Sequence, residues 1–202
     1  MLQAGSRIVV ATGNRGKLAE IRAILDEFLV AVVAQGELGI GEVEETGLTF
    51  VENALLKARN AAAVAAGPAI ADDSGLEVDA LGGAPGIRSA RYAGEPADDG
   101  ANIDRLLAAL AGAGDRSAAF RCVMVYLRHA EDPAPVIAEG VWRGRILTAR
   151  RGEGGFGYDP VFFDPGSGCS AAELGPAEKN RVSHRARALR ELARRLGAAE
   201  TQ

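Results

Sequence analysis

The spacing of apolar residues predicts a strand, a helix and a second strand at the start of the chain. The run at 7–12 is rich in β-branched residues and ends at a glycine, which is typical of a buried strand followed by a turn. Apolar residues then recur every three or four positions over 18–28, so a helix is expected to begin at Asn14 or Arg15. A second strand is expected at 29–33.

A second helix and a third strand are predicted next. Thr49 is followed three residues later by Glu52, which is the signature of a capping box at a helix start. Apolar residues keep helical spacing from there to a Gly-Pro pair that ends the helix. The apolar run at 69–73 predicts a strand that ends in two aspartates, and the Ser-Gly pair at 74–75 predicts a turn after it.

The rest of the chain is richer in strands and loops, so the whole pattern predicts a mixed α/β protein. Segments at 119–127 and 136–142 are expected to form long strands that pair in antiparallel. A final helix is expected after Ser183, and the tail at 198–202 is expected to fray. The other expected segments are a loop at 84–94, a helix at 101–110, a glycine-rich loop at 152–157 and a strand at 161–163.

Composition and charge narrow the class of protein. The 202 residues suffice for one large domain or two closely joined lobes, and a charged fraction of 25% is ordinary for a soluble globular protein. No apolar run reaches membrane-spanning length and no signal-peptide pattern is present, so no membrane partner is expected. The net charge of −4 argues against nucleic acid as a partner. Cys122 and Cys169 fit a reducing cytoplasm, which is the expected location.

The first candidate for chemistry is the loop between the first strand and the first helix. Free N–H groups at a helix start suit an anion, to which Thr12 and Asn14 can add hydrogen bonds and Lys17 a charge. The loop matches neither the Walker pattern nor G-x-G-x-x-G, so a plain strand-to-helix connection with Asn14 as N-cap is the alternative. The segment consists of Thr12, Gly13, Asn14, Arg15, Gly16 and Lys17.

Carboxylates gather in two places. Glu42, Glu44 and Glu45 share one loop, and Asp72 and Asp73 end an apolar strand. Oxygen ligands of this kind are what Mg²⁺ requires, with water and substrate phosphates completing its shell. Neighbours in a strand point to opposite sides, so only one of the two aspartates is expected to face a given site. The alternatives are a solvated acidic loop and ordinary turn chemistry.

The second half of the chain holds two segments suited to a flat ligand. Glycines on both sides of Phe156 leave room for a ring to stack on it, and Asp159 can accept hydrogen bonds from ring N–H groups. Lys179, His184 and Arg185 are donors that would donate hydrogen bonds to the O6 of a 6-keto purine and reject the amino group of adenine. The alternatives are a β-turn with core aromatics and a helix start with solvated charges.

Together these segments resemble the HAM1-like non-canonical purine nucleotide pyrophosphatases, also called inosine triphosphate pyrophosphatases, in their bacterial form. The segments occur in the family order and extend over nearly the whole chain. Among 23 basic residues only three are lysines, and all three fall within them. The matching segments are Thr12-Gly13-Asn14 with Lys17, 44–58, 71–76, 82–92, 155–160, and Lys179 with Ser183-His184-Arg185.

This resemblance implies an elongated α/β protein with a curved mixed sheet flanked by helices, a single domain over 1–202 with two lobes and a substrate cleft between them. It also implies a homodimer that uses Mg²⁺ to hydrolyse the triphosphates of inosine, deoxyinosine and xanthosine (ITP, dITP and XTP). The products would be the nucleoside monophosphate and pyrophosphate, so the enzyme would cleanse the nucleotide pool.

The resemblance also implies roles for individual residues. Asp73 would be the catalytic carboxylate, and Glu45 would join it in binding the metal, although Glu42, Glu44 and Asp72 lie close enough to substitute. The substrate-binding residues would be Thr12, Gly13, Asn14, Arg15, Gly16, Lys17, Asn53 and Lys57 at the triphosphate, with Ser74, Phe156, Gly157, Tyr158, Asp159, Lys179, His184 and Arg185.

Two other functions are compatible with the sequence. A Maf-like pyrophosphatase acts on other nucleotides and typically shows an Arg-rich opening motif, where this chain has Asn14 and Lys17. A nucleotide sensor without turnover would gain little from Asp73 and Glu45 beside a polyphosphate. A dinucleotide oxidoreductase is disfavoured because the glycine fingerprint is missing from the first turn.

Overall fold

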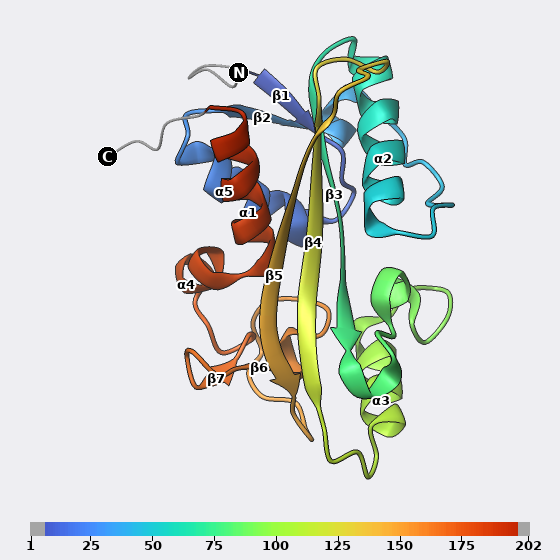
Figure 1. Ribbon diagram of the computed structural model, residues 1–202, viewed down its shortest axis with the longest axis vertical. Coiled ribbons are helices and arrows are strands. Elements are labelled where there is room, and N and C mark those ends of the chain that lie inside the picture. Colours follow the sequence, from blue (N-terminus) through green and yellow to red (C-terminus); the bar gives the residue numbers. More distant parts are fainter. Residues whose placement is uncertain (1–6, 198–202) are drawn as a thin grey trace. The chain divides into compact units, whose positions relative to one another are not determined.

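The computed structural model describes residues 7–197 (Figure 1). The expected frayed tail at 198–202 lies outside these described residues. The strands and helices are β1 (Arg7–Val10), α1 (Arg15–Asp26), β2 (Ala31–Ala34), α2 (Phe50–Ala65), β3 (Ala69–Val78), α3 (Asp99–Ala109), β4 (Ser117–Leu127), β5 (Val136–Ile146), β6 (Phe162–Asp164), β7 (Cys169–Ser170), α4 (Pro176–Val182) and α5 (His184–Arg195). Short 3-10 helices lie at Gln35–Leu38, Asp79–Leu81, Gly86–Arg91 and Asp159–Val161.

A mixed seven-stranded sheet forms the centre of the fold, in the order β2-β1-β3-β4-β5-β6-β7. Strand β1 pairs in parallel with β2 and β3, whereas β6 pairs in antiparallel with β5 and β7. This arrangement confirms the expected mixed α/β class. None of the helices described over 7–197 is long and apolar enough to cross a bilayer.

The chain forms two compact units, each assembled from separate stretches of sequence. Unit 1 comprises Met1–Asp73, Cys122–Gly140 and His184–Gln202, and unit 2 comprises Ser74–Arg121 and Val141–Ser183. Strands β3, β4 and β5 each contribute residues to both units, because the divisions fall inside them.

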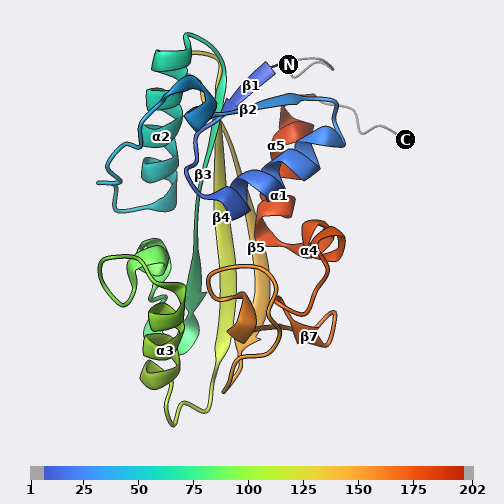
Figure 2. The ribbon, with the colours of Figure 1, turned by 180° about the vertical axis from the view of Figure 1, so that it is seen from behind.

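Unit 1 buries both faces of its strands, as the period-two alternation of strand side chains requires. Ile8 and Val10 of β1 pack in a core with α1 and α5, whereas Val9 and Ala11 pack in a second core with α2. Figures 1 and 2 show α1 and α5 on one side of these strands and α2 on the other. Side chains at alternate positions of β3 therefore face different helices.

Unit 2 has its own aromatic core. The Phe162 ring centroid lies 4.5 Å from that of Phe120 and 4.9 Å from that of Trp142. The Trp142 indole nitrogen donates to Asp164 Oδ1 at 3.1 Å, so the ring is buried without losing its hydrogen bond. Leu106 of α3 belongs to the same core.

The turn expected at 74–75 is absent, and that prediction is wrong. Strand β3 continues to Val78, because Leu76 and Val78 are fully buried in unit 2 and hold the segment extended. Gly75 is needed for a close approach: a Cβ there would lie 2.2 Å from the Gly86 carbonyl oxygen. The glycine that suggested a turn is instead a packing residue.

Other boundaries differ by small local effects. Strand β2 begins at Ala31 and not at 29, because Leu29 has φ 56° and so lies in the left-handed region. The segment expected as a loop at 84–94 contains the 3-10 helix Gly86–Arg91. Helix α4 was not predicted from the sequence. The predicted capping box of α2 is confirmed.

Candidate functional site

The loop between β1 and α1 has the geometry of a helix N-terminus ready to receive an anion. Asn14 is the N-cap, and its Oδ1 accepts a hydrogen bond from Lys17 N at 3.0 Å. Asn14 N donates to Thr12 Oγ1 at 3.2 Å, which closes the turn. Gly13 and Arg15 are exposed and Gly16 is half-buried, so the loop is accessible from solvent. No acidic residue stands in the first turn of α1, although the Glu42 carboxylate lies beside Gly13 in the loop before it.

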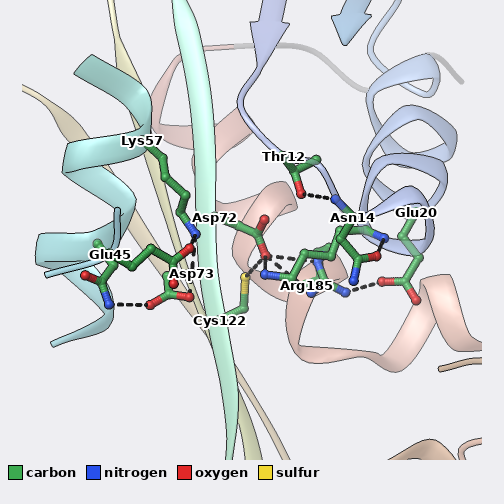
Figure 3. Close-up of polar contacts among 11 residues, drawn as sticks. Thr12, Asn14, Glu20, Glu45, Lys57, Asp72, Asp73, Cys122 and Arg185 are labelled. Atoms are coloured by element: carbon green, nitrogen blue, oxygen red, sulfur yellow. Dashed lines mark hydrogen bonds and ion pairs between the residues drawn. The ribbon is translucent and has the colours of Figure 1, made fainter. Parts of the chain in front are cut away.

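Asp72 and Asp73 of β3 face opposite sides of the strand, as the sequence predicted. Figure 3 shows Asp73 with Glu45 and Lys57 on one side, and Asp72 with Arg185 and Cys122 on the other. All of these residues belong to unit 1. The two neighbouring carboxylates therefore have different partners and different chemistry.

Asp72 is the centre of a buried ionic network. Its Oδ2 lies 3.1 Å from Lys17 Nζ and 3.3 Å from both Nε and Nη2 of Arg185. Arg185 is 1% exposed and forms a second ion pair with Glu20 of α1. Burial opposes the charge on Asp72, but Lys17, Arg185 and Lys57 outweigh it and hold its pKa well below the usual range.

Asp73 is hydrogen-bonded and ion-paired to residues of α2 and of the loop before it. Asn53 Nδ2 donates to its Oδ2 at 3.2 Å, and Lys57 Nζ lies 3.6 Å from its Oδ1. Lys57 also binds Glu45 Oε1 at 2.8 Å. Burial raises the pKa of Asp73, and the charges of Lys57 and Lys17 only partly offset that effect.

The pKa of Asp72 is lowered and that of Asp73 is raised, so the two carboxylates are suited to different roles. Asp72 is held ionised by its cations, so it serves as their counter-ion. Asp73 has a raised pKa and a side chain that is 7% exposed, which suits it to accept a proton from a neighbouring water. Neighbouring acids with divergent pKa values are typical of catalytic sites.

The residues around Asp73 also fit a divalent cation. No group of three or more His, Cys, Asp and Glu side chains with metal-binding geometry is found over 7–197. Mg²⁺, however, is commonly held by one or two carboxylates together with substrate phosphates and water. Asp73 and Glu45 supply two carboxylates that already converge on one cation, the Lys57 ammonium. Glu42 and Glu44 are exposed on the same loop.

A second cluster of predicted site residues lies in unit 2. Asp159 Oδ2 accepts hydrogen bonds from Phe156 N at 2.9 Å and from Lys179 Nζ at 2.5 Å. The Lys179 ammonium also lies 4.7 Å from the centre of the Phe156 ring. Asp159 and Lys179 are 3% and 6% exposed, so their charges are paired within the protein. The cluster therefore places the ring of Phe156 beside two hydrogen-bonding side chains, Asp159 and Lys179.

The remaining predicted residues have varied surroundings. Gly157 N donates to Asp99 Oδ2 at 2.7 Å, and Ser74 is half-buried in β3. Tyr158 is a core residue of unit 2, where its hydroxyl donates to the Ser89 carbonyl at 2.8 Å. His184 begins α5 and is 5% exposed.

The sequence analysis did not identify Glu20 and Cys122 as members of the Asp72 network. Glu20 pairs with Arg185, and the Sγ of Cys122 lies 3.9 Å from Asp72 Oδ2. Sequence reasoning also grouped Arg185 with Lys179, whereas the structure pairs Arg185 with Asp72 and Glu20. One signal was available: Glu20 follows Lys17 by three residues on a helix, so both lie on one face.

Comparison with known proteins places the chain among proteins of closely similar length and structure. A curated relative from Methylococcus capsulatus, named dITP/XTP pyrophosphatase, is 61% identical over 194 residues, which cover 95% of this chain and 96% of the relative. A relative of the same name from Vibrio parahaemolyticus is 54% identical over 198 residues, covering 97% and 99%.

Solved structures agree with these relatives. The HAM1 protein from Coxiella burnetii is 48% identical and has a TM-score of 0.88, over 96% of this chain and all of that one. A nucleoside-triphosphatase / dITP/XTP pyrophosphatase from Mycobacterium abscessus is 44% identical, with a TM-score of 0.73 over 92% and 98%. The Ham1 family model matches residues 8–195, which contain every site residue described above. The chain is thus a member of the Ham1 family.

Proposed function

We propose that this protein hydrolyses the non-canonical purine nucleoside triphosphates ITP, dITP and XTP to the monophosphate and pyrophosphate, and so removes them from the nucleotide pool. The observation that carries the proposal is Asp73, a carboxylate with a raised pKa between Lys57 and Asn53. Relatives named dITP/XTP pyrophosphatase support the substrate class.

The polyphosphate would be bound at the start of α1. Backbone N–H groups of the loop, the Thr12 hydroxyl and the Lys17 ammonium offer donors to the phosphate oxygens. Lys57 would bind from the other side of β3. Burial lowers the pKa of Lys57, but the charges of Asp72, Asp73 and Glu45 outweigh that effect and leave the pKa raised, so the ammonium stays charged. These cations offset the negative charge that builds up during phosphoryl transfer.

Asp73 would orient the attacking water and accept its proton. The water oxygen forms a bond to phosphorus, the bridging P–O bond between the α- and β-phosphates breaks, and pyrophosphate leaves. Asp72 cannot substitute for Asp73, because its pKa is depressed by Lys17 and Arg185.

Mg²⁺ is the proposed cofactor, held by Asp73 and Glu45 together with substrate oxygens. When bound, it would neutralise phosphate charge and polarise the phosphoryl oxygen. Glu45 is fixed for this role by Lys57 at 2.8 Å.

The base would be recognised by the unit 2 cluster of Phe156, Asp159 and Lys179. Phe156 would stack on the purine, Asp159 would accept from a ring N–H, and Lys179 would donate to the 6-keto oxygen. Arg185 is better suited to the phosphate side, because Asp72 and Glu20 already hold its guanidinium.

The proposal is tested by product analysis. Purified protein is incubated with Mg²⁺ and equal concentrations of the inosine, xanthosine, adenosine and guanosine triphosphates, and the products are identified by ³¹P NMR. Pyrophosphate is expected mainly from the first two compounds. Asp73→Asn should lower the rate by about 10²-fold or more, since the proton acceptor is lost. Asp79→Asn, at an exposed aspartate just after β3, is the matched control.

Three outcomes would contradict the proposal. Release of orthophosphate would mean that another bond is cleaved. Equal turnover of ATP would show that no 6-keto group is recognised, and binding of ITP without turnover would indicate a sensor.

A homodimer in the cytoplasm is proposed from the family resemblance, and light scattering of the purified protein tests the dimer.

A further inference from the structure

The amide of Asn53 joins the loop that carries Glu45 to the carboxylate of Asp73. Asn53 lies in the first turn of α2 and is 2% exposed. Its Oδ1 accepts a hydrogen bond from Gly47 N at 2.8 Å, and its Nδ2 donates to Asp73 Oδ2 at 3.2 Å. Both ends of the amide are therefore engaged by the protein itself.

The partners of Asn53 allow only one orientation of its amide. A backbone N–H can only donate, so Gly47 requires the oxygen, whereas the ionised carboxylate of Asp73 can only accept and requires the nitrogen. The contact is close because residue 47 has no side chain: a Cβ there would lie 2.7 Å from Asn53 Oδ1 and 2.6 Å from Glu52 Cβ. Gly47 thus permits the loop to approach the helix.

This arrangement fixes the carboxylate that the reaction depends on. Asn53 holds Oδ2 of Asp73, while Oδ1 faces Lys57 at 3.6 Å. Without the amide, the carboxylate group could rotate about its Cβ–Cγ bond, which is a soft torsion. The same amide holds the loop at a set distance, and Lys57 then binds Glu45 from that loop.

We propose that Asn53 is a positioning residue, whose amide sets the rotation of the Asp73 carboxylate and the place of the 42–47 loop beside it. The inference rests on the proposed function, in which Asp73 activates water. It replaces the role expected from the family resemblance, in which Asn53 contacts the triphosphate. The two roles differ in what they predict for binding and for turnover.

The test separates turnover from binding in three variants. Asn53→Ala removes both hydrogen bonds. Asn53→Asp keeps an oxygen that can accept from Gly47 but places a second carboxylate against Asp73. Asn60→Ala is the matched control, because Asn60 lies two turns further along α2 and donates to the carbonyl of Gly41, just before the 42–47 loop, at 3.1 Å. Thermal unfolding of each variant monitors folding.

We expect kcat for ITP to fall about 10- to 100-fold in Asn53→Ala and Asn53→Asp, since misplacing a catalytic group slows the chemical step. Binding of the α,β-methylene analogue of ITP, measured by calorimetry, should stay within about twofold of the wild type, since Asn53 is not assigned a phosphate contact. Asn60→Ala should retain both values.

A double variant tests whether Asn53 acts through Asp73. In an Asp73→Asn background, Asn53→Ala should lower the residual rate by less than about twofold, because residues that act as a unit are not additive. A further tenfold loss would overturn the proposal. So would weaker analogue binding with unchanged kcat, or wild-type kcat in Asn53→Asp. An inactive wild-type protein would instead refute the proposed function itself.

Discussion

Asp72 and Asp73 are adjacent in sequence and both buried, yet they have different hydrogen-bond partners and pKa shifts of opposite direction. Strand geometry alone predicted that they face opposite sides. Which of them would be the counter-ion could not be predicted, because the cations come from distant segments: Arg185 is 113 positions away from Asp72. The raised pKa of Asp73 likewise follows from tertiary burial, which a single sequence does not display.

The depressed pKa of Asp72 predicts how stability depends on pH. An aspartate with a folded pKa below its unfolded value of about 3.9 stabilises the protein above that pH, and its contribution is lost as pH falls toward the folded pKa. Asp72→Asn should therefore be less stable than the wild type at pH 7. The difference should narrow below about pH 4, by up to about 1.4 kcal/mol per pH unit. Urea unfolding of both proteins from pH 7 to pH 3 measures it, and a constant difference would contradict the assignment.

Arg185 offers a second test at the residue scale. Replacing it by methionine keeps bulk but leaves Asp72 and Glu20 without the guanidinium, and breaking a buried ion pair costs about 3–5 kcal/mol. Arg187→Met, at an exposed position of the same helix, should change the free energy of unfolding by less than about 0.5 kcal/mol. Equal effects in urea unfolding would show that the network adds no stability.

At the scale of elements, local sequence signals were reliable where a short segment decides its own structure. The Asn14 N-cap, the capping box of α2 and the final helix after Ser183 are all found in the structure. The turn predicted at 74–75 is absent, because glycine occurs at close backbone contacts as well as in turns. Only the tertiary structure, which places the Gly86 carbonyl beside Gly75, shows that this glycine serves close packing. Sheet order could not be predicted either, since it depends on contacts between remote strands.

The capping box of α2 carries a prediction of its own. Thr49 Oγ1 accepts from Glu52 N at 3.3 Å, and Glu52 Oε2 accepts from Thr49 N and Leu48 N, each at 2.8 Å. Thr49→Ala should lower the free energy of unfolding by about 1 kcal/mol, because an N–H group at the helix start loses its partner. Thr148→Ala, at an exposed position outside the helices and strands, should have little effect. Urea unfolding measures both variants, and equal free energies of unfolding for Thr49→Ala and Thr148→Ala would disprove the role of the cap.

At the scale of the whole molecule, unit 1 is completed by the last helix. Ile21, Ile24 and Leu25 of α1 share a core with Leu189 and Leu192 of α5. A chain that stops at Ser183 would leave this core half-formed, so it should show no cooperative unfolding transition for unit 1. A chain that stops at Gly197 keeps every described helix and strand and should unfold like the full protein. Circular dichroism during heating compares the two, and a cooperative transition in the shorter chain would refute the prediction.

The late position of α5 has a consequence during protein synthesis. The ribosome releases the chain from its N-terminus, so α1, Asp73 and Lys57 all emerge long before Arg185 and α5, the helix that shares a core with α1. A nascent chain would therefore expose the apolar face of α1 until α5 has been synthesised. Chaperones would find a binding surface there, and a chain cut short before α5 would lack both Arg185 and the helix that completes this core.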